Sequence, residues 1–82
     1  MDKILDTYAF DIDIIDLSYK KLSKLPDLTR FTKLKVLCCA NNLLTELHNL
    51  PESLTELYCN DNQLTKLNNL PNTLNKLCNS VN

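Results

Sequence analysis

With 82 residues, the chain is long enough for one small domain, whose core is close to the smallest that is stable on its own. Nine basic and ten acidic residues leave a net charge of −1, so neither a nucleic acid nor an anionic membrane is favoured as a partner. The sequence has no glycine, which phosphate-binding loops, dinucleotide fingerprints and nucleophile elbows all require, and sites of these kinds are therefore excluded.

The first segment, residues 1–11, lacks the pattern that organises the rest of the chain. Asp2 is well placed to cap a short helical turn there, because an acidic residue stabilises the start of a helix. The side chains available for packing are Ile4, Leu5, Tyr8 and Phe10. We predict that they cover the first coil of the following array as an N-terminal cap, the alternative being a docking peptide.

Residues 12–33 carry apolar side chains at successive spacings of 3, 2, 5, 3 and 3. These side chains are Ile12, Ile15, Leu17, Leu22, Leu25 and Leu28. The close spacings at the start predict a short strand near 13–17, whereas the later ones fit neither strand alternation nor a regular helix. The end of the segment, LPDLTRFTKL, predicts an extra helical turn with Leu28 and Phe31 pointing inward.

From residue 34 onward, apolar residues recur at equivalent positions with a constant period. The copies begin at Leu34, Leu54 and Leu74. LKVLCCANNLLTELHNLPES is followed by LTELYCNDNQLTKLNNLPNT and by the partial copy LNKLCNSVN. Strands are predicted near 35–39, 55–59 and 75–78, and a turn and an irregular return segment follow the strand in each complete copy. A single coil cannot bury its own leucines, so we expect stacked coils that share one continuous core.

The ninth place of the later copies holds an asparagine: Asn42, Asn62 and Asn82. An amide beside the core must be hydrogen-bonded, and asparagine can hold both the turn of its own coil and the backbone of the next. We therefore predict a structural ladder, the alternative being asparagines that bind a sugar or a metal. In the first coil this place is Lys20, which cannot accept a hydrogen bond, and the ladder is in question there.

The spacing L-x-x-L-x-[LC]-x-x-N-x-L resembles that of leucine-rich repeats. The copies with LPES and LPNT look like the short repeats of bacterial type III effector proteins, and LCCANN and LYCNDN are similar to repeat arrays of giant DNA viruses. A cap at 1–11 would precede repeats 12–33, 34–53 and 54–73 and a partial repeat 74–82. The resemblance implies an α/β solenoid with short parallel β-strands on the concave face, irregular or 3₁₀ convex segments, and a concave face that binds another protein.

Strand alternation places one set of side chains on the concave side. They are Ile14, Val36, Cys38, Glu56, Tyr58, Lys76 and Cys78. Tyrosine is a frequent interface anchor, so Tyr58 is the leading candidate for a contact residue, the alternative being an ordinary cross-strand contact. The chain is therefore interpreted as a protein–protein interaction module and not as an enzyme.

The four cysteines are expected to be reduced thiols. Cys39 and Cys59 fall on core places, whereas Cys38 and Cys78 face outward two strands apart, roughly 10 Å and too far for a disulfide. We expect no cofactor or metal, because the cysteines alternate between interior and surface and the DIDIID run offers no third ligand. His48, on a return segment, is too far from the outward thiols for Cys–His catalysis.

The setting of the module leaves alternatives open. The alternatives to a protein–protein interaction module are a substrate-recognition fragment of a larger effector or ubiquitin-ligase-type protein, and a structural spacer. The longest apolar run, Val36–Ala40, is too short for a signal peptide or a membrane span, so a cytoplasmic location is expected, in the host cytoplasm for an effector. The last strand, from Leu74 to Cys78, is expected to self-associate through its edge or to fray after Pro71.

Overall fold

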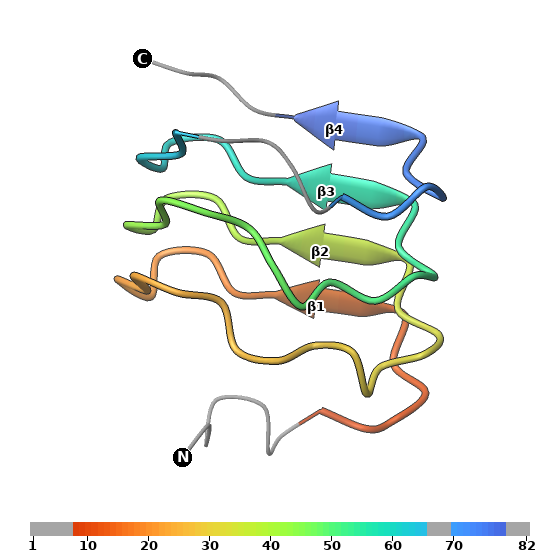
Figure 1. Cartoon of the computed structure of the whole chain (residues 1–82). Helices are drawn as coiled ribbons and strands as arrows, with labels where there is room; N and C mark the ends of the chain where they lie inside the picture. The colour runs from red at the N-terminus through yellow and green to blue at the C-terminus, as the bar shows by residue number, and fades with distance from the viewer. Residues whose placement is uncertain (1–7, 66–69, 79–82) are drawn as a thin grey trace.

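The computed structural model describes residues 8–65 and 70–78, which form four short parallel strands in one open sheet (Figure 1). They are β1 (Ile14–Asp16), β2 (Val36–Cys38), β3 (Glu56–Tyr58) and β4 (Lys76–Cys78), in that order across the sheet. All four predicted strands are thereby confirmed. The described residues contain no helix, and so none with the length and apolar character needed to cross a membrane.

The repeat period sets the register of the sheet. Leu37 of β2 pairs with Leu57 of β3, which in turn pairs with Leu77 of β4, so each partner lies one repeat period further along the chain. Ile15 of β1 pairs with Leu37, which lies two residues beyond one such period. The two extra residues of the first coil therefore lie outside its strand. The parallel strands, stacked in chain order, are compatible with a solenoid-like arrangement.

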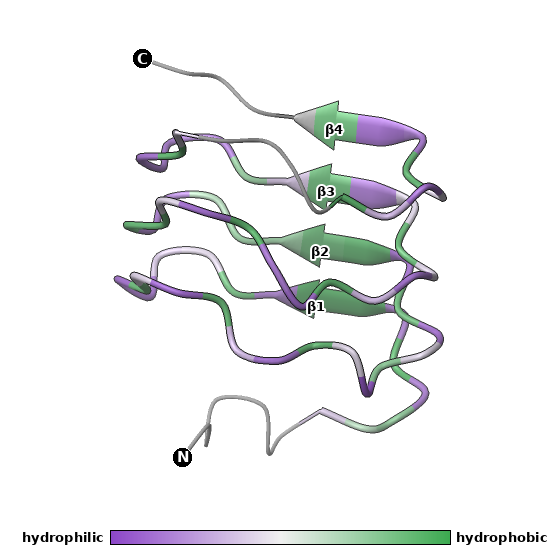
Figure 2. Cartoon of the chain, viewed as in Figure 1, coloured by the Kyte–Doolittle hydropathy of each residue, from purple (hydrophilic) through white to green (hydrophobic). Residues whose placement is uncertain are grey.

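The core lies between the sheet and the return segments, which cross the same face of the sheet (Figure 1). An apolar residue occupies the centre of every strand (Figure 2). The buried residues of the core are Ile15, Leu17, Leu25, Leu28, Phe31, Leu34, Leu37, Cys39, Leu44, Leu47, Leu50, Leu54, Leu57 and Cys59. They occupy the predicted core places of successive coils, and the apolar area that they remove from water is the main stabilising term.

The end of the first return segment is a pair of turns. Leu28 and Phe31 are buried, as predicted, with exposed fractions of 0% and 1%. The expected helical turn is replaced by two separate hydrogen-bonded turns, in which Phe31 N donates to Leu28 O and Leu34 N donates to Phe31 O, both at 3.1 Å. The two turns direct the chain back to β2 within a few residues, and that leaves no room for the successive bonds of a helix.

The predicted asparagine ladder is present at Asn42 and Asn62. The Nδ2 atom of Asn42 donates to Cys39 O at 3.0 Å in its own coil and to Leu17 O at 2.8 Å in the coil before. Its Oδ1 accepts from Lys20 N, at 3.0 Å. Asn62 Nδ2 repeats the pattern with Cys39 O at 2.9 Å. Each amide thus joins its coil to the preceding one, and the expectation that it joins the next coil was wrong.

This direction explains why Lys20 does not interrupt the ladder. In the turn that contains Lys20, the backbone N atoms of Lys20 and Leu22 donate to Asn42 Oδ1 of the following coil, so this turn is held without an asparagine at position 20. Asn82, the third predicted member, lies outside the described residues.

The turns after β1, β2 and β3 contain residues with a left-handed backbone, and the chain builds these turns without glycine. Asn41 and Asp61 hold the eighth place of the second and third coils with φ of 58° and 60°. Asparagine and aspartate tolerate this region better than other residues with a Cβ atom. The first coil instead has Tyr19 at φ 57° and Lys21 at φ 55°, residues for which the left-handed region costs about 1–2 kcal/mol each.

Only part of the predicted N-terminal cap can be located, because Asp2, Ile4 and Leu5 lie outside the described residues. Tyr8 packs against the core, with its ring edge-on to Phe31 at 6.5 Å between centroids. Phe10 was expected to join it, but this side chain is 75% exposed. Residues 9–12 form a turn closed by Ile12 N and Ala9 O at 3.2 Å, and Phe10 lies within that turn, pointing away from the core.

Candidate functional site

The outward side chains of the four strands form two rows, which together we call the strand face. The register places Ile14, Val36, Glu56 and Lys76 side by side in the first row. It places Asp16, Cys38, Tyr58 and Cys78 in the second row. Six of the seven predicted contact residues therefore belong to one surface, and Cys78 has its backbone in the second row, its side chain lying outside what the structure describes.

The polarity of the first row of the strand face changes from β1 to β4. Its first row is apolar on β1 and β2 and charged on β3 and β4 (Figure 2). Ile14 is 56% exposed, which is unusual for an isoleucine that has a place in a sheet. Val36 is half-buried beside it, and Lys76 is exposed at the far side. A partner that matched this surface would need an apolar part over β1 and β2 and a polar part over β3 and β4.

Tyr58 lies near the middle of the strand face and is held by its neighbours. Its hydroxyl donates to Glu56 Oε1 at 2.5 Å, and Lys76 Nζ lies 5.7 Å from the centroid of its ring. The hydrogen bond to the Glu56 carboxylate and partial burial raise the pKa of the phenol, while Lys76 acts in the opposite direction. The ring is therefore fixed before any partner arrives, which reduces the side-chain entropy lost on binding.

Asp16, the second-row residue of β1, is held by hydrogen bonds from Ser18. Ser18 donates to Asp16 Oδ1 from both its hydroxyl, at 2.6 Å, and its backbone N, at 3.0 Å. These two bonds lower the pKa of the Asp16 carboxyl, with Lys20 adding to the effect. Asp13 is exposed nearby, and no group of three or more His, Cys, Asp or Glu side chains in the described part of the chain could hold a metal ion.

The described cysteines follow the predicted alternation. Cys38 is a half-buried thiol on the strand face, and the side chains of Cys39 and Cys59 are both 0% exposed. Burial raises the pKa of the Cys39 thiol well above its ordinary value, and the neighbouring thiols Cys59 and Cys38 add to the shift. Cys38 and Cys78 lie on β2 and β4 with β3 between them, as the sequence predicted.

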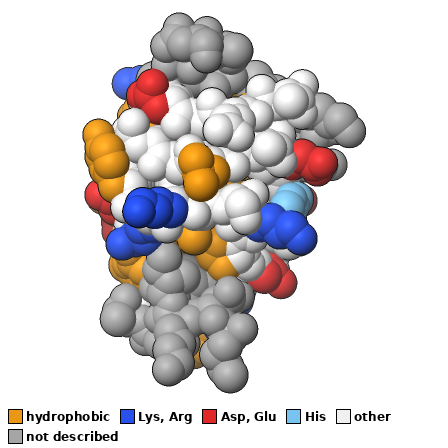
Figure 3. All heavy atoms as spheres, turned by 90° about the vertical axis from the view of Figure 1, so that its left-hand side faces the viewer, with side chains coloured by type: hydrophobic (Ala, Val, Ile, Leu, Met, Phe, Trp, Pro, Cys, Tyr) orange, Lys and Arg blue, Asp and Glu red, His pale blue; other side chains and the backbone are white. Residues whose placement is uncertain are grey.

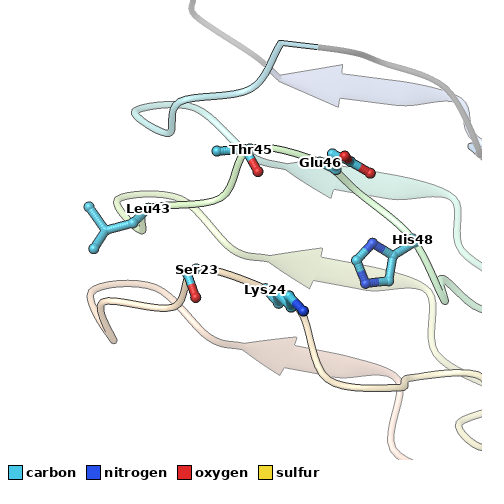
Figure 4. A pocket seen from close by; sticks show the side chains of 6 residues that line it. All are labelled: Ser23, Lys24, Leu43, Thr45, Glu46 and His48. Carbon is cyan, nitrogen blue, oxygen red and sulfur yellow. The ribbon is translucent and has the colours of Figure 1, made fainter.

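A hollow of about 460 Å³ lies away from the strand face, between the return segments of the first two coils (Figure 4). It is lined by Ser23, Lys24, Leu43, Thr45, Glu46 and His48. Sequence reasoning missed this hollow because its lining residues fall on places that the core pattern of the repeat does not explain. It did place His48 on a return segment, where the structure has it. The ammonium group of Lys24, the carboxylate of Glu46 and the imidazole of His48 thus line one hollow.

Comparison with protein-family models, with curated proteins and with solved structures gave no significant match. The function must therefore be inferred from the geometry of the chain.

Proposed function

We propose that the chain is a leucine-rich-repeat module that binds another protein through the strand face, which would be the concave face of its solenoid. The constant repeat period, the in-register parallel strands and the asparagine bonds between coils support this assignment. Repeat arrays of this kind stack coils to present an extended surface, and binding to a partner is the use to which such surfaces are suited.

The observation that carries the proposal is the fixed position of Tyr58. An aromatic ring near the centre of a surface, already oriented by Glu56 and Lys76, has the properties of an interface anchor. Val36 and Cys38 lie half-buried on the adjacent strand, so a partner side chain that packed on the ring would also cover apolar area on β2. The rest of the strand face would then exclude water around the anchor.

A comparison of variants tests the proposal. The double variant Tyr58→Ala with Val36→Glu removes the anchor and puts a charge into the apolar side of the strand face. Thr32→Glu is a matched control, because it adds the same charge at an exposed turn position outside the sheet. Proteins captured by the wild-type chain are identified, and the affinity of each for the three forms is measured by calorimetry.

We expect the double variant to lose at least about tenfold in affinity and the control to keep it, as for the loss of an anchor worth about 1–2 kcal/mol. Unchanged affinity in a folded double variant would show that the partner binds elsewhere. Capture of no partner by the wild-type chain would favour the structural-spacer function.

A further inference from the structure

The turn of the first coil presents unusual side chains to solvent. Residues 19–24, which we call the lysine turn, carry Tyr19 with 77% of its area exposed and the exposed Lys20, Lys21 and Lys24. Leu43 of the next turn is 46% exposed. In Figure 3, which looks onto the turns, Lys and Arg side chains lie beside separate hydrophobic ones. The core uses neither Tyr19 nor Leu43, so folding alone does not explain them.

The lysine turn adopts its backbone at a conformational cost that the other turns avoid. Tyr19 and Lys21 have φ of 57° and 55°, whereas the corresponding turns have Asn41 and Asp61 in the left-handed region. A residue in an unfavourable backbone region persists where the surrounding structure enforces it, and such residues concentrate at sites of function. At position 19 the chain has a bulky aromatic residue where asparagine would fit with less strain.

Neighbouring groups hold the lysine turn in place. Asn42 Oδ1 accepts from both Lys20 N and Leu22 N at 3.0 Å. Tyr19 N donates to Ala40 O at 3.3 Å. The backbone that carries Tyr19 and the lysines is thus tied to the second coil, and its side chains project from a fixed support.

The surroundings of the lysine turn indicate what it would bind. Three lysines lie within residues 19–24, and of these the Asp16 carboxyl interacts with Lys20 alone, so positive charge remains in excess here. The adjoining hollow of about 460 Å³ has both Lys24 and Leu43 among its lining residues (Figure 4), and its volume is large enough for an apolar side chain. Glu46 in the hollow and Asp61 on the turn of the third coil would be repelled by a flat anionic bilayer, whereas a narrow peptide can avoid them.

We propose that the lysine turn, Leu43 and the adjoining hollow form a second binding surface, for an acidic protein segment that carries an apolar residue among its carboxylates. The carboxylates pair with Lys20, Lys21 and Lys24, and the apolar residue packs against Tyr19 and Leu43. This surface is separate from the strand face and does not depend on the function proposed for it.

Two fluorescent peptides test this surface with the full chain. One has glutamates around a single leucine, and the other has lysines in place of the glutamates; phosphatidylserine-containing vesicles are a third probe. We expect the glutamate peptide to bind with an affinity that falls as salt rises, and to shift the amide resonances of residues 19–24 and Leu43. Lys20→Glu with Lys21→Glu should weaken binding about tenfold, whereas Lys33→Glu with Lys35→Glu, the same charge change elsewhere, should not.

Tyr19→Asn separates binding from folding. Asparagine suits the left-handed backbone, so this variant should raise the melting temperature and yet weaken binding of the glutamate peptide. The proposal is overturned if the glutamate peptide does not bind, if the lysine peptide binds equally well, or if both double charge reversals weaken binding alike. It is also overturned if the vesicles bind and the peptides do not, or if Tyr19→Asn is less stable than the wild-type chain.

Discussion

The amide of Asn62 donates a hydrogen bond to the carbonyl of Cys39, 23 residues earlier in the chain, at 2.9 Å. The same Nδ2 atom donates to Cys59 O of its own coil at 3.1 Å, and Leu44 N donates to its Oδ1 at 3.0 Å. One side chain thus bonds to backbone groups of two successive coils. The coils are joined by these amides as well as by the leucine core.

Replacing these asparagines should therefore destabilise the chain strongly. Asn42→Ala removes the bonds to Leu17 O, Lys20 N and Leu22 N, and we expect a loss of about 2–4 kcal/mol in the free energy of unfolding, measured by urea denaturation. Asn62→Ala should cost less, because Asn62 is only half-buried while Asn42 is 5% exposed. Lys20→Ala is the matched control at the same repeat position, and a loss equal to that of Asn42→Ala would contradict the ladder.

Stacking of the central leucines gives a second prediction. Leu57 is 0% exposed and pairs in register with Leu37 and Leu77 on either side. Leu57→Ala should cost about 2–5 kcal/mol, as for other buried leucines. Leu77→Ala serves as the comparison and should cost clearly less, since Leu77 is 39% exposed. A cost near zero for Leu57→Ala would show that the coils do not stack.

The repeat period was sufficient to predict the register, because a constant offset of one repeat allows Leu57 to pair only with its equivalents. It did not predict the direction of the asparagine bonds, since the donors and acceptor of an amide can be satisfied from either neighbouring coil. The outward position of Phe10 was not predicted either. It is set by the hydrogen bond between Ile12 N and Ala9 O, which closes the local turn, and not by the pattern of apolar residues. The spacing of the apolar residues also gives no indication that Tyr19 has a left-handed backbone.

The strand face could be predicted from the sequence, whereas the hollow beside Lys24 could not. The strand face follows from alternation, which assigns Val36 and Cys38 to one side of β2 and Leu37 to the other. Alternation does not predict that the Tyr58 hydroxyl donates to Glu56, because this contact depends on side-chain rotamers. The hollow beside Lys24 depends on how two return segments lie against each other, and the periodic leucines do not specify that packing.

Thiol labelling checks the phase of the strands. Cys38 should react with a thiol reagent in the folded chain, and strand alternation predicts the same for Cys78. Cys39 and Cys59 should react only after unfolding, because both are fully buried. Mass spectrometry of a labelling time course separates the four sites. Equal rates at all four in the folded chain would show that the assignment of inward and outward residues is wrong.

The buried thiol of Cys39 also predicts a loss of stability at alkaline pH. Burial raises the pKa of this thiol in the folded chain above its ordinary value of 9.0, so the folded state keeps the proton when the unfolded state releases it. The contribution of this thiol to the free energy of unfolding is therefore fully present below about pH 9. Above that pH it falls by about 1.4 kcal/mol per pH unit. Urea denaturation at pH 8 and pH 10 should show a smaller decrease for Cys39→Ala than for the wild-type chain. Equal decreases would rule out this thiol as a source.

The edge of β4 gives the last prediction, for the isolated polypeptide of 82 residues. In the described structure β4 pairs with β3 on one side only, Leu77 is 39% exposed and Leu74 is half-buried. An unpaired edge beside exposed apolar area favours pairing with another chain. Antiparallel pairing of two β4 strands about a two-fold axis would bring the Leu77 side chains of both copies together on the inner face.

We therefore expect this polypeptide either to dimerise through β4 or to fray after about Pro71. Sedimentation velocity over a range of concentrations distinguishes the two outcomes. Leu77→Lys should abolish the dimer and leave the earlier coils folded, because it puts the charge at the edge and not between stacked coils. A strict monomer in which the amides are protected from hydrogen exchange through Leu77 would contradict both outcomes, since it would show that β4 is stable with its outer edge unpaired.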